Sequence, residues 1–412
     1  MVSRRAVMAT FIALFCSTQL LWASGWSAAS PQAQYPINVS GQQCLYSSGY
    51  VYCINGYALG IYTNSTYSAQ ITSQGVGQWA SQAPYPQADF GQSCAAYSGM
   101  IYCTSGYNGT SYINATYSAD LSQGTFADWH TLIPYPLEVS GISCASAESS
   151  MICIGGNDTY GDNTNLTYYT TLNGNVISSP QASGSVWAKT APYPINVSGA
   201  ECNGYGAYVY CIGGQTNQGY TNATFFTKFN SSGAHAWQAA TPYPVAASGI
   251  SCATSQGYML CVGGYNGAVQ TNDTYEAQIT SAGIGSWTAM PGYPALVSSA
   301  SCFSPGSTVY CIGGYNGTLY SNAVYYIGVA QQSGAATTVG IVSPNAVTIS
   351  ATTTALATTA TTSSANVTAA QQSGSTAMPV LYAVIAAIAV IIALYAYMRI
   401  ARKYHSDRSG KP

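Results

Sequence analysis

The sequence predicts an all-β fold built from six copies of one unit. Tyrosines followed by proline stand at Tyr35, Tyr85, Tyr135, Tyr193, Tyr243 and Tyr293, and a Cys-x8-Cys pair follows each of them. Both series advance by 50, 50, 58, 50 and 50 residues, and a tryptophan precedes each of the last five tyrosines by six residues. A fixed period of this length is typical of a repeat architecture in which each unit forms one small sheet.

Each unit has the pattern of four short strands, named a to d. Strand a carries Ser-Gly-x-x-Cys, and strand b alternates around the second cysteine, as in 208–212. Strand c follows an asparagine, as in 272–279, and strand d holds the tryptophan. Alternation, β-branched and aromatic residues, and glycine or asparagine between segments favour strands over helices. Six such units, filling 35 to about 327, predict a six-bladed β-propeller.

The end of strand b resembles a known repeat. Residues 311–317 read Cys-Ile-Gly-Gly-Tyr-Asn-Gly, with Asn322 and Tyr325 after them, and this resembles the kelch repeat. The resemblance implies a kelch-like propeller over 30–330. Repeats three to six keep the glycine doublet, whereas repeats one and two have Asn55-Gly56 and Ser105-Gly106. Strand a also lacks the arginine and histidine of many kelch repeats, so no known ligand of the family transfers directly.

Ring closure is the open question of this topology. The last unit has strands a to c, to about Gly328, and no tryptophan after them. We expect N-terminal residues to supply strand d of the sixth blade, because this removes the open sheet edge. Trp26 is a candidate for the sixth tryptophan, although it precedes Tyr35 by nine residues. If a signal peptide is removed after Ala29, closure depends on residues 32–35 alone.

The cysteine spacing predicts one disulfide in each blade. A two-residue turn at Ser48-Gly49 puts Cys44 opposite Cys53 at a non-hydrogen-bonded position, within disulfide range. Even numbers of cysteines outside the cytoplasm favour disulfides, and the spacing does not suit the alternatives of metal ligands or free thiols. The predicted bonds are Cys44–Cys53, Cys94–Cys103, Cys144–Cys153, Cys202–Cys211, Cys252–Cys261 and Cys302–Cys311.

The two ends of the chain predict export and membrane anchoring. Residues 1–29 have a basic start, an apolar run and small residues, as in a cleaved signal peptide; a retained N-terminal anchor is the alternative. Residues 378–398 are apolar and long enough to cross a bilayer as a helix, and the tail 399–412 is basic, which predicts that it is cytoplasmic. Residues 331–376, rich in Ala, Thr, Ser and Gln, predict a disordered stalk. We therefore expect a single-pass cell-membrane protein with its propeller outside.

The exported part of the chain is poor in charge and rich in glycosylation sequons. Between residues 27 and 378 it has two basic residues, Lys189 and Lys228, against ten acidic ones. A protein with few ion pairs loses little stability when its carboxylates are protonated in acid. The low charge therefore suits an acidic environment, and it suits equally a surface covered by glycans. Twelve Asn-x-Ser/Thr sequons occur, and five begin strand c: Asn64, Asn114, Asn165, Asn222 and Asn272. Turn geometry explains asparagine there but not the recurring threonine, so we expect N-glycosylation.

One face of the predicted disc is a candidate ligand surface. In a four-stranded blade the d–a and b–c loops lie on the same face. The candidate residues are Tyr57, Tyr107, Tyr265 and Tyr315 in the b–c loops, and Tyr85, Tyr135, Tyr193, Tyr243 and Tyr293 in the d–a loops. Tyrosine among Asn, Ser and Gly supplies rigid contact area and adaptable hydrogen bonds. The alternative, especially for the Pro-Tyr-Pro tyrosines, is packing between blades.

The residues favour a binding module over an enzyme. A copper enzyme resembling galactose oxidase needs histidines gathered at one site, but His130 and His235 lie in different blades. The acids include one close pair, Asp158 and Asp162, and no repeated pair for glycoside chemistry. We expect no cofactor, metal or nucleic acid. The first hypothesis is cell-surface adhesion through an extracellular protein or carbohydrate ligand; the second is a structural component of the cell envelope, such as a surface layer; the enzyme is third.

Overall fold

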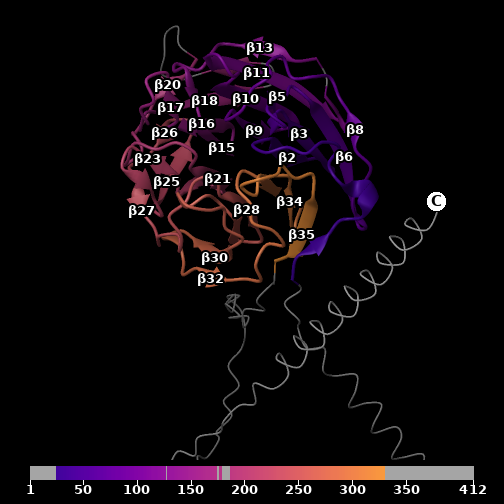
Figure 1. Ribbon diagram of the computed structural model, residues 1–412. Coiled ribbons are helices and arrows are strands. Elements are labelled where there is room, and N and C mark those ends of the chain that lie inside the picture. Colours follow the sequence, from indigo (N-terminus) through magenta and orange to yellow (C-terminus); the bar gives the residue numbers. More distant parts are fainter. Residues whose placement is uncertain (1–24, 127, 174–175, 179–185, 330–412) are drawn as a thin grey trace, which may run out of the picture. The chain divides into compact units, whose positions relative to one another are not determined.

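Six antiparallel sheets surround a central axis, as Figure 1 shows for a computed structural model that describes residues 25–126, 128–173, 176–178 and 186–329. The strands nearest the axis are β2 (Gln43–Ser47), β9 (Ser93–Tyr97), β15 (Ser143–Ala147), β21 (Glu201–Tyr205), β28 (Ser251–Ser255) and β33 (Ser301–Phe303). Each contacts the next, and β33 contacts β2, so the ring is closed. The prediction of an all-β, six-bladed propeller is confirmed.

Two further strands complete the body of each blade. Strand b is β3 (Tyr50–Ile54), β10 (Met100–Tyr107), β16 (Ser150–Ile154), β22 (Tyr208–Ile212), β29 (Tyr258–Val262) or β34 (Thr308–Ile312). Strand c is β6 (Thr66–Thr72), β11 (Tyr112–Ser122), β18 (Thr167–Asn173), β25 (Thr224–Asn230), β30 (Thr274–Thr280) or β35 (Val324–Gly328). Strands b and c are antiparallel in all six blades, as expected for successive strands joined in a hairpin.

Strand d differs from the expectation because it is split into two short pieces. The first pieces are β7 (Gly75–Val76), β12 (Thr125–Phe126), β19 (Val176–Ser178), β26 (Gly233–Ala234) and β31 (Gly283–Ile284). The second pieces are β8 (Ala80–Ser81), β13 (His130–Leu132), β20 (Ala188–Lys189), β27 (Gln238–Ala239) and β32 (Thr288–Ala289). In blades one to five the tryptophan directly precedes the second piece of strand d. Its side chain packs against the core at the point where the strand is interrupted.

The sixth blade is closed by the N-terminal segment. Strand β1 (Ser27–Ala28) pairs with β35 at Tyr325 and Tyr326, the register that β8 has on β6. The Trp26 indole N–H donates to the Pro291 carbonyl (3.2 Å), just as Trp79 donates to Ala33 (3.0 Å). Trp26 is therefore the sixth tryptophan. The propeller begins before residue 30, and η1 (Pro31–Ala33), one turn of 3-10 helix, follows β1.

The tyrosines of the d–a loops lie in the interior, which corrects the assignment of five of them to the ligand face. Tyr85, Tyr135, Tyr193, Tyr243 and Tyr293 are at most 2% exposed, as is Tyr35. Each packs edge-on against the tryptophan of its own blade and an aromatic residue of strand c, as in Tyr85–Trp129 (4.8 Å) and Tyr85–Tyr117 (5.2 Å). Burial raises the pKa of all six phenols. These tyrosines therefore build the blades and do not meet a ligand.

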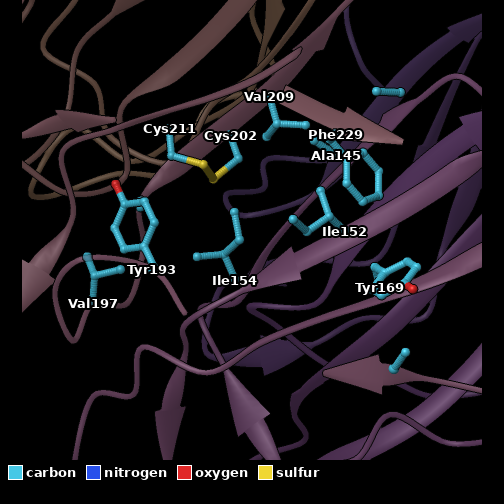
Figure 2. Close-up of a cluster of buried hydrophobic side chains, with 13 residues drawn as sticks. Ala145, Ile152, Ile154, Tyr169, Tyr193, Val197, Cys202, Val209, Cys211 and Phe229 are labelled. Atoms are coloured by element: carbon cyan, nitrogen blue, oxygen red, sulfur yellow. A yellow bond between two sulfur atoms is a disulfide. The ribbon is translucent and has the colours of Figure 1, made fainter. Parts of the chain in front are cut away.

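The disulfides link strand a to strand b inside the core. All six bonds predicted from the spacing are present, each with a Cα–Cα separation of 4.1 Å. Figure 2 shows how Cys202–Cys211 joins a cluster that includes Ile152, Ile154 and Val209, which come from two adjacent blades. Each bond thus fixes the strand lining the axis to the buried strand behind it.

Both ends of the described propeller lie on one face. β35 runs from the b–c side to the a–b side, where the Val329 N–H donates to the Ser307 carbonyl (2.8 Å). β1 is antiparallel to β35, so the chain enters at Trp26 from that same side. The opposite face carries the b–c hairpins and the d–a loops, and we name it the hairpin face.

Several expected segments lie outside the described residues. These are residues 1–24 of the signal peptide, the stalk at 331–376, the membrane helix at 378–398 and the tail at 399–412. Within the described ranges, no helix is long and apolar enough to cross a membrane.

Candidate ligand-binding face

The b–c hairpins start from a left-handed backbone turn. In repeats three to six both glycines of the doublet have positive φ, as at Gly155 (66°) and Gly156 (103°). A Cβ added to Gly155 would lie 2.3 Å from the Val197 carbonyl of the next blade, so glycine is required there. Asn55 takes this conformation in the first blade with φ 58°, which asparagine tolerates better than most residues.

Each hairpin is joined to the loop before strand a. The residue after the doublet pairs with the residue that follows the d–a loop, as in Ser40 with Tyr57 and Phe90 with Tyr107. Small two-stranded sheets form within two hairpins: β4 (Tyr57–Ala58) with β5 (Ile61–Tyr62), and β23 (Gln215–Thr216) with β24 (Gly219–Tyr220). In blade three, β14 (Val139–Ser140) of the loop before strand a pairs with β17 (Asn157–Asp158) of the hairpin. The hairpins are thus anchored to the blades at their bases.

Six tyrosines form a continuous arc over blades six, one and two. The centroids of successive rings are separated by 4.9 Å (Tyr315–Tyr320), 5.7 Å (Tyr320–Tyr57), 4.9 Å (Tyr57–Tyr62), 5.9 Å (Tyr62–Tyr107) and 5.0 Å (Tyr107–Tyr112). All six side chains are half-buried. The arc ends where the Tyr112 hydroxyl donates to Asn157 Oδ1 (2.9 Å). We call these six residues the tyrosine arc.

The predicted tyrosines supply only half of this arc. Tyr57, Tyr107 and Tyr315 belong to it, whereas Tyr265 packs against Tyr220 (5.5 Å) in a separate pair. Sequence reasoning missed Tyr62, Tyr112 and Tyr320, each five residues after a predicted tyrosine. In the sixth and first blades, the second tyrosine contacts the first tyrosine of the next blade. This five-residue spacing, repeated in three units, is the signal that would have identified them.

Some arc tyrosines also stabilise their own hairpins. The Tyr107 hydroxyl donates to the Gly109 carbonyl (2.9 Å), and the Tyr315 hydroxyl donates to Gly317 (2.7 Å). These bonds hold the hydroxyl at the turn while part of each ring stays exposed. The b–c tyrosines therefore have a structural contact and an accessible surface at once.

The tips of the hairpins are apolar. Leu59 is 76% exposed and Ile61 67% in the first blade, and Leu319 is 64% exposed in the sixth. Tyr160 and Val269 are exposed at the tips of the third and fifth hairpins, away from the arc. Exposed apolar residues gathered on one face of a protein are typical of an interaction surface.

A polar cavity runs along the axis and opens between the hairpins. Its volume is 1070 Å³, and strand a of every blade contributes to its wall. Serine side chains link neighbouring blades there, as where the Cys144 N–H donates to Ser93 Oγ (2.8 Å). In blade four the residue before the first cysteine is Glu201 instead of serine. Its carboxylate accepts a hydrogen bond from the Asn203 side-chain amide (3.1 Å). Loss of hydration raises the pKa of Glu201 to about 7 despite this bond.

A second acid, Asp89, lies fully buried where blades one and two meet. It occupies the position that Val139 and Val197 hold in other blades, and its Oδ1 accepts from the Asn55 amide. Its Oδ2 has no hydrogen-bond partner. Burial raises the pKa of Asp89 to about 8, with the Asn55 bond acting in the opposite direction. Burial therefore favours the protonated form of this carboxyl.

The remaining candidate residues for catalysis are scattered. His130 and His235 are exposed on different blades. Asp158 accepts from the backbone N–H groups of Tyr160 (2.9 Å) and Asp162 (3.1 Å), which is a turn-stabilising role. The described ranges contain no group of three or more His, Cys, Asp or Glu side chains suited to a metal ion.

The five asparagines expected to carry glycans lie at the base of the hairpins. Asn64, Asn222 and Asn272 are exposed, and Asn114 and Asn165 are partly buried. Their backbone carbonyls accept from the N–H of the buried tyrosines, as Asn64 does from Tyr85 (3.0 Å). The backbone of this position is therefore fixed in every repeat.

Comparison with known proteins agrees with this architecture. A family model described as the KLHDC2/KLHL20/DRC7 Kelch-repeats domain matches residues 141–333. No curated protein matches the chain. The solved chain described as "Structure of YjhT" aligns with a TM-score of 0.58 at 12% identity, covering 71% of this chain and 96% of that one. At this identity the likeness concerns the fold alone.

Proposed function

Because the chain belongs to the kelch-repeat propeller family and has a disulfide in every blade, we propose that it is an extracellular binding module whose ligand site is the tyrosine arc. The observation that supports this most directly is the continuity of the arc. Half-buried aromatic rings from three blades form one surface, held by hairpins whose bases are fixed.

A polypeptide surface is the ligand class that fits this arc best. Leu59, Ile61 and Leu319 extend the arc with exposed apolar side chains. Tyrosine with neighbouring apolar residues is typical of the centre of protein–protein interfaces, where charged residues are depleted. The propeller has only two lysines and no arginine between residues 27 and 378, so an anionic ligand would find little charge to pair with.

The proposed anchoring attaches the propeller by the face opposite the hairpin face. The described propeller ends at Val329 on the a–b side, and the predicted stalk and membrane helix follow in sequence. A tether leaving from that side would be attached to the face opposite the tyrosine arc and would leave the arc accessible. This arrangement suits adhesion to a neighbouring cell or to a secreted protein.

The test is binding of the labelled ectodomain, starting at Gly25 so that Trp26 is kept, to intact cells of the same source. Replacing Tyr57 and Tyr320 together by alanine should weaken binding at least tenfold, roughly 1.4 kcal/mol. The matched control is Tyr205→Ala, which removes a 42% exposed tyrosine at an a–b turn and should leave binding unchanged. Unchanged melting temperatures in all variants would show that the fold is intact. Wild-type binding by the arc variant would refute the proposal.

The same assay separates the other ligand classes. Protease treatment of the target cells should abolish binding, and glycosidase treatment should not. The reverse result would favour a carbohydrate, for which the polar axial cavity is the alternative site. Ordered self-assembly of the ectodomain would favour the envelope role. That the protein is not an enzyme stays a prediction, and stoichiometric metal in the purified chain would revive the enzyme hypothesis.

A further inference from the structure

In five of the six blades strand c contains a threonine, at one equivalent register, whose side chain lies in the interior. These threonines are Thr66, Thr116, Thr167, Thr224 and Thr274, and each is at most 2% exposed. The sixth blade has Val324 at this register, fully buried opposite Ile312, as Thr66 lies opposite Ile54. The fold therefore accepts an apolar residue of the same shape at this position.

The hydroxyl has a hydrogen-bond partner in only some blades. Thr116 bonds to Thr104 (2.9 Å), Thr167 accepts from the Tyr193 N–H (3.2 Å), and Thr274 accepts from Trp26 Nε1 (3.2 Å). The hydroxyls of Thr66 and Thr224 are buried without a partner. An unpaired buried hydroxyl disfavours folding, and valine has the same shape without it. Folding alone therefore favours valine at Thr66 and Thr224.

The asparagines two residues earlier also lack a structural use for their side chains. Asn64 and Asn222 are exposed, and within the described ranges no hydrogen bond involves their side-chain amides. By contrast, the Asn266 side chain accepts from the N–H groups of Ala268 (2.9 Å) and Val269 (3.0 Å), and it is not part of a sequon. Turn geometry thus explains Asn266 but does not explain the side chains of Asn64 and Asn222.

We propose that Asn64 and Asn222 carry N-linked glycans, and that Thr66 and Thr224 are retained because the glycosylating enzyme requires their hydroxyls. The proposal rests on the export of the ectodomain proposed above. The co-reactant is a lipid-phosphate-linked oligosaccharide. A bond forms between the Asn amide nitrogen and the anomeric carbon, the bond from that carbon to the phosphate oxygen breaks, the lipid phosphate leaves, and the amide proton passes to a base of the enzyme.

The burial of the threonines fixes when this transfer takes place. In the finished blade Thr66 is the first residue of β6, pairs with Ile54 of β3 and is 2% exposed, so an enzyme that reads its hydroxyl cannot reach it. Transfer must therefore precede the docking of β6 on β3 and of β25 on β22. The chain is expected to be modified while it is being exported, before the propeller closes.

The first experiment is peptide mapping by mass spectrometry of the full chain isolated from its own cells. Saccharide masses are expected on the peptides containing Asn64 and Asn222. Unmodified asparagines in a chain with all six disulfides intact would overturn the glycosylation proposal and leave export standing. Unmodified asparagines together with free cysteines would overturn the export on which it rests.

The second experiment separates sequon recognition from a structural role of the hydroxyl. In a glycosylating host Thr66→Val should abolish the glycan on Asn64, and Thr66→Ser should retain it. Made in a host without the enzyme, Thr66→Val should have a denaturation midpoint no lower than that of the wild type. The matched control Thr116→Val loses the bond to Thr104 and should have a lower midpoint. An equal loss of stability in both variants would overturn the proposal.

Discussion

Replacing Asp89 by asparagine is expected to change how the stability of the propeller depends on pH. Asp89 is 1% exposed, its pKa is raised to about 8 by burial, and it accepts a hydrogen bond from Asn55. The neighbouring phenols of Tyr85 and Tyr117 have raised pKa values and stay neutral over the range considered. The folded protein therefore holds a proton that the unfolded chain releases.

The sign and size of the effect follow from linkage. Because the folded-state pKa lies above the unfolded one, near 3.8, the contribution of Asp89 to stability is fully present below pH 4 and is lost as pH rises to 8. A difference of about four pKa units corresponds to a loss on the order of 5 kcal/mol across this range. The asparagine variant keeps the shape of the side chain and cannot ionise.

The assay is urea denaturation followed by tryptophan fluorescence from pH 4 to pH 9, with the disulfides intact. Wild type and Asp89→Asn should have similar midpoints near pH 4, and the variant should become the more stable protein as pH approaches 8. The double variant Asn55→Gly with Asp89→Val introduces the glycine and valine that meet as Gly155 of blade three and Val197 of blade four. It should show the same reduced pH dependence. Parallel midpoint curves for wild type and Asp89→Asn would refute the reasoning.

Two further predictions concern the closure and the stapling of the blades. Trp26→Ala removes an edge-on contact with Tyr293 (4.9 Å) and the indole hydrogen bond to Pro291, so it should lower the free energy of unfolding by about 2–4 kcal/mol. The control Trp129→Ala should lower it by a similar amount. A much smaller effect at Trp26 would contradict its role as the sixth tryptophan. Replacing Cys94 and Cys103 together by alanine opens a loop of about ten residues, and the urea midpoint should fall by an amount equivalent to about 2–3 kcal/mol; an unchanged midpoint would show that the bond does not limit unfolding.

The periodic features of the fold were predictable because they repeat. The tyrosine and cysteine series share the same steps, and these predicted the number of blades and all six disulfides, since pairing across a two-residue turn depends only on local register. Closure by the N-terminal segment was predictable from the missing strand d. The splitting of strand d was not, because pieces of two or three residues leave no alternation to detect.

The candidate site was harder to predict because it depends on contacts between blades. Tyr62 meets Tyr107, and Tyr320 meets Tyr57, only after the ring has closed. The departure from Gly-Gly at Asn55 was visible in the sequence, but its partner Asp89 lies 34 residues away in the next blade. The Pro-Tyr-Pro tyrosines are in loops by sequence, yet they turn inward because each fills a space beside a tryptophan.

The buried acids help to decide between the two explanations of the low charge. A glycan cover and an acidic environment both suit a propeller whose basic residues are Lys189 and Lys228. A glycan cover does not account for carboxyl groups whose pKa is raised by burial, as it is for Asp89, Glu201 and Glu276. Each of these groups binds its proton more tightly in the folded state, so acid strengthens the fold through them, whereas a native ion pair would be lost. Acid therefore stabilises the fold through these groups, a property that suits acidic surroundings, and the proposed glycans at Asn64 and Asn222 are compatible with it.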